Sequence, residues 1–519
     1  MKSSRAPWIG ASRFLPVLLA GAVLITLATA ASAAKKAPAK KAGTSAASTT
    51  PPTKSQPATA AQGAGPGQRA LENYLAKRSF VHVGLQAVWL KDGAVLASRD
   101  PQTPMQPASV HKLATSAVVM SVLGSEFKFT TTLATLGEDL LVVGDGDPTL
   151  GDPIMASESG GTIYDVPDAW VAKLKELKIT AIKGKIIVDD GIFEGGRNPD
   201  WPRGQESTWY SAPVSGLNFN DNCLDISVRR TGASVSAELS PASQFMDVIN
   251  RLTAGSKDTY HMRLANEDRT VTLLGQVKSS SSSPQPTAIN EPALLFGRVL
   301  ADRLVRGGIQ FSGSIERRVV VGPDRKLPAE AKVVAQHATP VAAALARANK
   351  RSLNMTAENL LQRATAQVTG RATFADGRRV ATAVLVKSYG VNENELTISD
   401  GCGLSHANRV SPNAMVTLMR GLVFRPDANV FLSSLSVAGV DGTLHDRFKP
   451  YAGRILGKTG TIDGVSTLAG FILDKQNVPA VAFAIFCNDT RGTNWQARAV
   501  QDALVIDWLS QVDARTPAK

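Results

Sequence analysis

Segments typical of β-strands stand near both ends of the 519-residue chain, and they constrain the fold more than any other feature. Each shows an alternation of apolar and polar residues or a run of β-branched ones. They are 81–90 and 94–98 near the start, and 453–458, 466–473 and 478–486 near the end. Helical patterns at 69–78 and 495–512 flank them. We therefore expect one antiparallel sheet built from both ends of the chain, which makes the middle an insertion.

The middle of the chain differs in character from its ends. Residues 126–290 carry short alternating or β-branched segments, interrupted by one helical pattern at 166–177. From residue 291 onward, helical periodicity returns. We expect residues 68–125 and 291–519 to form one α+β domain, and residues 126–290 to form an inserted β-rich module of one or two subdomains.

The N-terminus has the pattern of a secretory signal. Lys2, Arg5 and Arg13 precede an apolar run at 14–28, and residues 31–33 (Ala-Ser-Ala) have the spacing that a signal peptidase reads. We expect residues 1–33 to be a signal peptide that exports the protein to the periplasm or cell-envelope space. An uncleaved membrane anchor is the alternative, since the run approaches the roughly 18 apolar residues that a span needs.

Residues 34–67 are rich in Ala, Lys, Pro, Ser and Thr and contain no aromatic residue. Such a segment buries too little apolar surface to offset its ordering entropy, so we expect a disordered linker. Its five lysines are suited to loose contact with an anionic envelope; a merely solvated linker is the alternative. Residues 1–67 hold eight Lys or Arg and no Asp or Glu, so the net charge of +13 does not indicate a nucleic-acid partner.

The cysteines and histidines give no sign of a metal or cofactor. Cys223, Cys402 and Cys487 are widely spaced, and the six histidines form no His-Glu-x-x-His pattern. We expect three buried, free thiols, no metal site and no cofactor.

Ser109 and Lys112 are the first candidate catalytic pair. A helix expected from Ser109 to about 123 puts the two side chains on one face, with Ser109 as the N-cap. A lysine amine activates a hydroxyl only when neutral, and its reference pKa is about 10.4. Burial and a second nearby cation both lower that value.

This spacing alone is weak evidence of chemistry, because Ser125 and Lys128 repeat it. The second pair follows a helix-stopping glycine and enters a strand pattern, where the two residues do not share a helical face. We expect no chemistry from it.

Two further motifs strengthen the assignment. Ser352-Leu353-Asn354 lies in the break between helical patterns at 339–350 and 356–368, and Lys458-Thr459-Gly460-Thr461 ends the strand pattern at 453–458. Ser-x-x-Lys, Ser-x-Asn and Lys-Thr-Gly, in this order, are the motifs of penicillin-binding proteins and serine β-lactamases. Ser411-Pro412-Asn413 also fits Ser-x-Asn, but a serine N-cap before a proline explains it.

From residue 70 to the C-terminus, the chain resembles the class C low-molecular-mass penicillin-binding proteins, D-alanyl-D-alanine carboxypeptidase/endopeptidases of the penicillin-binding protein 4 type. Beyond the motifs, the segments that resemble this family are 144–150, 209–213, 218–222, 400–405 and 437–444. The long interval between Ser109 and Ser352 also matches the family, whereas a β-lactamase would have a far shorter one. The resemblance implies a transpeptidase fold, similar to serine β-lactamases, with inserted β-rich domains.

The resemblance also implies roles for eight residues. Ser109 would attack the carbonyl between the two terminal D-alanines of a peptidoglycan stem peptide, with Lys112 as general base. Ser352 would relay a proton to the leaving amine, and Lys458 would add positive potential. The substrate-binding residues would be Asn354, Thr459, Gly460 and Thr461. The backbone N–H groups of Ser109 and Thr461 would form the oxyanion hole, and β-lactams would be covalent inhibitors.

Two other functions remain open from the sequence. A non-catalytic envelope protein could keep the fold and bind peptidoglycan, although the intact Ser109, Lys112, Ser352 and Lys458 argue against it. A β-lactamase or esterase on the same fold would differ by hydrolysing its acyl-enzyme quickly.

Overall fold

The structure is a computed structural model that describes residues 65–515. The predicted signal peptide and almost all of the predicted linker lie outside the described residues and stay predictions. Helix α1 (Pro66–Ala76) begins inside the predicted linker, with a proline in its first turn, so the linker prediction ran slightly too far. Among the described residues, no helix combines the length and apolar character needed to cross a membrane.

A six-stranded antiparallel sheet joins the two ends of the described chain, as predicted. Its strands, in order, are β18 (Ser436–Val437), β19 (Ile455–Ile462), β20 (Val465–Leu473), β21 (Pro479–Asn488), β1 (His82–Trp89) and β2 (Val95–Arg99). Strand β1 pairs with β21, with Leu85 opposite Ile485, so a strand from the start of the chain is held by one from its end. Every residue of β20 is buried, as in a strand covered on both faces.

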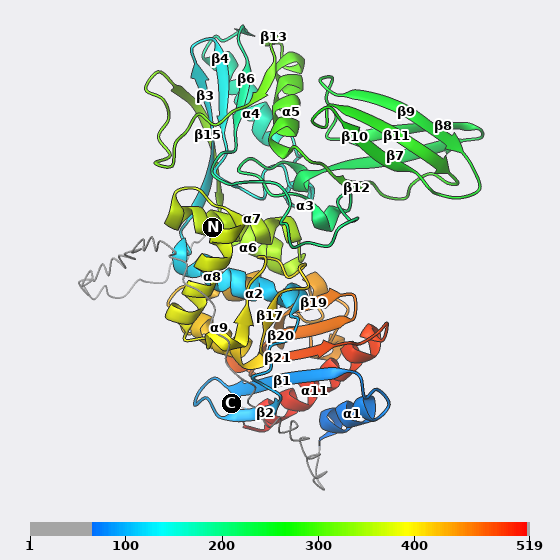
Figure 1. Cartoon of the computed structure of the whole chain (residues 1–519), viewed down its shortest axis with the longest axis vertical. Helices are drawn as coiled ribbons and strands as arrows, with labels where there is room; N and C mark the ends of the chain where they lie inside the picture. The colour runs from blue at the N-terminus through cyan, green and yellow to red at the C-terminus, as the bar shows by residue number, and fades with distance from the viewer. Residues whose placement is uncertain (1–64, 516–519) are drawn as a thin grey trace, which may run out of the picture. The chain divides into compact units, whose positions relative to one another are not determined.

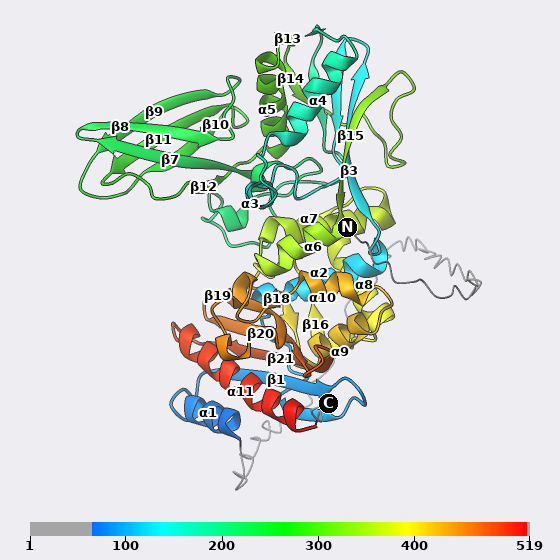
Figure 2. The ribbon, with the colours of Figure 1, turned by 180° about the vertical axis from the view of Figure 1, so that it is seen from behind.

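Alternate side chains of β21 pack into two different hydrophobic cores. Phe483 and Ile485 pack with α1 and α11 (Asn494–Arg515), the helices on one face of the sheet. Ala484 and Phe486 pack with α2 (Lys112–Val122) and α9 (Pro412–Val423) on the other face. Figures 1 and 2 show α11 and α2 on opposite sides of this sheet.

Helix α7 (Asn354–Thr369) is the central helix of the second core. Every residue from Asn354 to Ala366 is buried, although many are polar. The helices packed near it are α6 (Val341–Lys350), α8 (Phe374–Tyr389) and α2, with α10 (Ala428–Ser434) against α6. The start of α7 therefore lies beside α2, which carries Lys112.

The middle of the chain forms four further sheets, the smallest of which pairs β13 (Gln310–Phe311) with β5 (Ala181–Ile182). A five-stranded sheet has the order β14 (Ile315–Arg317), β6 (Ile186–Asp189), β4 (Asp139–Val143), β3 (Lys128–Leu136), β15 (Lys332–Pro340). One three-stranded sheet contains β12 (Gln285–Ala288), β7 (Cys223–Thr231) and β8 (Ser234–Ser240), and another β10 (His261–Ala265), β11 (Thr270–Val277) and β9 (Asp247–Ala254). The helices of this region are α3 (Pro153–Glu158), α4 (Asp165–Glu176) and α5 (Pro292–Arg306).

The expected end of the insertion at residue 290 is wrong. Phe296 and Leu300 of α5 belong to the same core as Leu133 and Val188 of the five-stranded sheet. Strand β15 pairs with β3, so the chain leaves this sheet only near Pro340. Helical periodicity identifies α5 as a helix but does not indicate which sheet it covers, which explains the error.

Arg347 ties helix α6 to the insertion. Its side chain is only 6% exposed, and its guanidinium binds Asp152 and, at 2.7 Å, Asp221. Asp152 accepts the backbone N–H groups at the start of α3. Burial and the nearby Asp152 raise the pKa of Asp221 to about 8, whereas Arg347 opposes this rise.

We predict that Arg347→Met lowers the free energy of unfolding by about 3–5 kcal/mol, because it leaves the buried acidic side chains of Asp152 and Asp221 without the cation that they both bind. Arg351→Met is the matched control: Arg351 also reaches α3, but its pair with Glu158 is half exposed and should contribute about 1 kcal/mol or less. Urea unfolding of both variants measures the difference. Equal losses would contradict the role given to Arg347.

Candidate functional site

Ser109 lies in a 3-10 turn, Ala108–His111, that leads directly into α2. The prediction that Ser109 caps the helix is wrong, because α2 has His111 at its N-cap position and Ser109 lies inside the preceding 3-10 turn. The hydroxyl instead faces Lys112, whose Nζ lies 3.0 Å from Ser109 Oγ. The turn thus presents the serine to the lysine one turn further on.

Lys112 is buried, at 1% exposure, and has three polar neighbours. Its Nζ donates to Asn354 Oδ1 at 2.7 Å and to the Cys402 carbonyl at 2.8 Å, and Ser109 Oγ is the third neighbour. A neutral amine has two N–H groups and one lone pair, and the first two neighbours here are pure acceptors. The lone pair is then left for the hydroxyl, the only neighbour that can donate.

Burial lowers the pKa of Lys112, although Cys402, Asp400 and Glu358 oppose the shift. The orientation of the Asn354 amide is fixed, because its Nδ2 donates to the Tyr210 carbonyl at 2.9 Å and its Oδ1 therefore faces Lys112. The surroundings therefore favour the neutral base.

Ser352 and Lys458 form the second pair. Lys458 Nζ donates to Ser352 Oγ and to the Thr459 carbonyl, each at 2.8 Å. Lys458 is fully buried, and this burial, followed by the nearby Lys112, lowers its pKa well below the usual range. Ser352 has a φ of 62°, in the left-handed region that non-glycine residues rarely adopt, as is often found at functional sites.

Gly460 allows strand β19 to approach the serine. A Cβ at this position would lie 2.9 Å from Ser109 N and 2.8 Å from the Pro107 carbonyl oxygen. Thr467 Oγ1, on the neighbouring strand, donates to that carbonyl at 2.7 Å. The Lys-Thr-Gly motif lies within β19, which continues to Ile462, and not at the end of the strand as predicted.

A pocket of about 460 Å³ opens in front of these groups. Ser109 and Ser352 line it, together with Thr459, Gly460 and Thr461 of β19. Lys112, Asn354 and Lys458 are not part of this lining. Lys112 is hydrogen-bonded to Ser109 and Asn354, and Lys458 is hydrogen-bonded to Ser352. The structure thus brings all eight predicted site residues together.

Several groups that the motifs do not identify complete the site. They are the carbonyls of Tyr210 and Cys402, the hydroxyl of Thr443, and Arg498. The Trp-Tyr and Gly-Cys-Gly segments that carry the two carbonyls had been recognised only by their resemblance to the family. A backbone carbonyl leaves no signature in the sequence.

The two competing motifs are structural, as predicted. Ser125 Oγ bonds Glu126, and Lys128 is exposed at the start of β3. Ser411 Oγ accepts the backbone N–H of Ala414, with Pro412 at the first position of α9.

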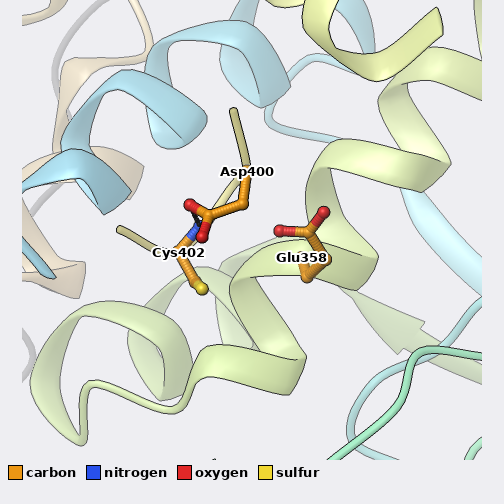
Figure 3. A group of neighbouring side chains, drawn as sticks. All are labelled: Glu358, Asp400 and Cys402. Atoms are coloured by element: carbon orange, nitrogen blue, oxygen red, sulfur yellow. Dashed lines mark hydrogen bonds between the residues drawn. The ribbon is translucent and has the colours of Figure 1, made fainter. Parts of the chain in front are cut away.

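Glu358, Asp400 and Cys402 form a buried group that the sequence did not indicate (Figure 3). Their potential ligand atoms lie within 4.8 Å of one another, a spacing that can hold a metal ion. Both Asp400 oxygens, however, accept hydrogen bonds from N–H groups. The donors are Trp201 Nε1, Asn408 Nδ2 and the backbones of Cys402, Gly403 and Ser405.

Burial raises the pKa of the Cys402 thiol well above its usual range, so it stays protonated. Glu358 accepts the Gly401 N–H at 2.5 Å. This bonding holds the loop that presents the Cys402 carbonyl to Lys112. All three cysteines are buried and free, as predicted.

Burial and Asp400 raise the pKa of Glu358 to about 8, from about 4.3 in an unfolded chain. Between these values the folded state holds one proton more than the unfolded state, so the free energy of unfolding falls as pH rises. Glu358→Gln keeps a hydrogen-bond acceptor but cannot ionise. We predict that its free energy of unfolding falls less steeply with pH than that of the wild type, by up to about 1.4 kcal/mol per pH unit. Urea unfolding from pH 5 to 9 measures it; parallel curves for the two proteins would contradict the shift.

Comparison with known proteins decides the family. Residues 68–512 match the model of the D-Ala-D-Ala carboxypeptidase 3 (S13) family. The chain belongs to this family. It is a serine-type D-alanyl-D-alanine carboxypeptidase of the penicillin-binding protein 4 type, as the resemblance implied.

Individual relatives agree. The D-alanyl-D-alanine carboxypeptidase of Actinomadura sp. (strain R39) is 29% identical over 453 residues, which cover 82% of this chain and 80% of that protein. The crystal structure of penicillin-binding protein 4 from Haemophilus influenzae has a TM-score of 0.70 at 21% identity, and the match covers 85% of this chain and 99% of that one. A second structure of that protein, with a β-lactam, has a TM-score of 0.66 at 20% identity. The expected α+β transpeptidase fold with inserted β-rich domains is confirmed.

Proposed function

We propose that this carboxypeptidase removes the terminal D-alanine of peptidoglycan stem peptides through an acyl-enzyme on Ser109. The observation that carries the proposal is the position of Lys112 Nζ. It has two acceptors for its N–H groups, Asn354 Oδ1 and the Cys402 carbonyl, and lies 3.0 Å from Ser109 Oγ.

The first step is the attack of Ser109 on the peptide carbonyl. Lys112 accepts the hydroxyl proton while Oγ bonds to the carbonyl carbon of the penultimate D-alanine. The negative charge that develops on the carbonyl oxygen is stabilised by the backbone N–H groups of Ser109 and Thr461. Each such donor typically contributes about 10²–10³ in rate. The close approach of β19 to Ser109 that Gly460 permits supports this assignment.

The second step is the departure of the terminal D-alanine. We assign the protonation of its amine to the Ser352 hydroxyl, whose Oγ accepts a hydrogen bond from Lys458. The C–N bond breaks as the amine takes the Ser352 proton, and the proton that Lys112 took from Ser109 passes to Ser352, which leaves Lys112 neutral again. Water then attacks the ester, gives its proton to Lys112, and releases the shortened peptide with Ser109 regenerated.

We extend the proposal to crosslinks and to location. An endopeptidase reaction has the same chemistry, with an amine of a second stem peptide as the leaving group. Export by a signal at 1–33 would bring the enzyme to peptidoglycan, and the five lysines of the linker at 34–67 would make loose contact with the envelope. β-Lactams would acylate Ser109 by the first step.

We predict that Ser109→Ala abolishes covalent labelling by a fluorescent penicillin and the loss of D-alanine from purified muropeptides. Ser125→Ala, the matched control in the repeated Ser-x-x-Lys spacing, should keep both. Gel fluorescence and mass spectrometry measure the two outcomes; conversion of muropeptide dimers to monomers reports endopeptidase activity.

An unlabelled wild-type protein would favour the non-catalytic alternative. A label that forms and disappears quickly would favour a β-lactamase or esterase. Either result would contradict the proposed function.

A further inference from the structure

Arg498 reaches the catalytic pocket from an unexpected direction. It belongs to the first turns of α11, which covers the face of the central sheet opposite to α2. Its Nη2 nevertheless donates to Thr461 Oγ1 at 3.1 Å, and the side chain lines the same pocket as Ser109 and Ser352. A helix from the end of the chain therefore contributes a side chain to the mouth of the site.

Arg498 is a cation of the pocket lining that no carboxylate of the described residues neutralises. The other arginine in the lining, Arg447, binds Asp502 and Gln501. Asp446 of the lining binds Lys449 and the neighbouring His445. Among the described residues, no carboxylate forms an ion pair with Arg498.

The catalytic lysines do not offer the same charge to a substrate. Lys458 is fully buried and lies outside the pocket lining. Its Nζ donates hydrogen bonds to Ser352 Oγ and to the Thr459 carbonyl. Burial, followed by the nearby Lys112, lowers the pKa of Lys458 well below its usual range, which disfavours its charged form. An exposed arginine stays charged at every physiological pH.

The hydrogen-bond directions distinguish the two threonines of the motif. Thr459 Oγ1 donates to Thr443 Oγ1 at 2.9 Å, so its proton is engaged within the protein. Thr461 Oγ1 accepts from Arg498, which leaves its own proton free to donate. Thr461 and Arg498 thus present a hydroxyl donor and guanidinium donors side by side.

We propose that Arg498 and Thr461 together bind the free C-terminal carboxylate of the substrate, which makes Arg498 a specificity-determining residue for this reaction. The proposal rests on the proposed function. A guanidinium and a hydroxyl suit a carboxylate because the planar N–H groups of arginine match its two oxygens, and the charge strengthens each bond. A substrate whose terminal carboxylate is masked loses this interaction.

The test compares two synthetic stem peptides, one ending in a D-alanine acid and one in a D-alanine amide. For the acid, Arg498→Gln should lower kcat/KM about tenfold to a hundredfold, the loss expected for charge-assisted hydrogen bonds. For the amide, kcat/KM should change little, and Arg498→Lys should restore part of the preference for the acid. The charge-matched control is Arg251→Gln, an exposed arginine in β9, which should leave both substrates unchanged.

One result would overturn the inference: an acid-to-amide preference that is unchanged in Arg498→Gln, whether both substrates keep their kcat/KM or both lose it equally. The penicillin label, taken to completion at saturating concentration, should persist in Arg498→Gln and shows that Ser109 remains active. A wild-type protein that neither takes the label nor cleaves the acid would refute the proposed function itself, which is a different outcome.

Discussion

The catalytic site depends on one desolvated amine. Lys112 is a poor base in water because it is charged, and a poor core residue because it is polar. Both difficulties are resolved when its two N–H groups meet Asn354 Oδ1 and the Cys402 carbonyl, so that the lone pair is left toward Ser109 Oγ. Much of the surrounding structure can be understood as the means of holding those two acceptors and that hydroxyl in place.

The three neighbours of Lys112 come from distant parts of the chain. Ser109 enters from the turn before α2, Asn354 begins the buried helix α7, and Cys402 lies on a loop held by Asp400 and Glu358. Strand β19 closes the site from the other side, and only a glycine at position 460 lets it come so near Ser109. The buried Arg347 connects the insertion to α6, the helix that precedes Ser352. Contacts far from the pocket therefore help to position Ser352.

Much of this could be predicted from the sequence, and what could not has physical reasons. The site was identified by the spacing of Ser109 and Lys112 and by the order of the three motifs, because the residue type determines the chemistry of a side chain. The Cys402 carbonyl and the contact from Arg498 were missed because a backbone acceptor and a tertiary approach leave no pattern along the chain. The capping role given to Ser109 and the boundary at residue 290 failed because local propensity does not reveal tertiary partners: Lys112 for the hydroxyl, and the five-stranded sheet for α5.

The pH dependence of acylation tests the central claim most directly. The rate at which a penicillin acylates Ser109 should rise with pH as Lys112 loses its proton, because only the neutral amine accepts the hydroxyl proton. Stopped-flow measurement across pH should give an apparent pKa clearly below the value of about 10.4 for an ordinary lysine. Burial lowers the pKa of Lys112, so the plateau should be reached at correspondingly lower pH. A rate that rises only near the ordinary lysine pKa, or that does not depend on pH, would contradict the neutral lysine base.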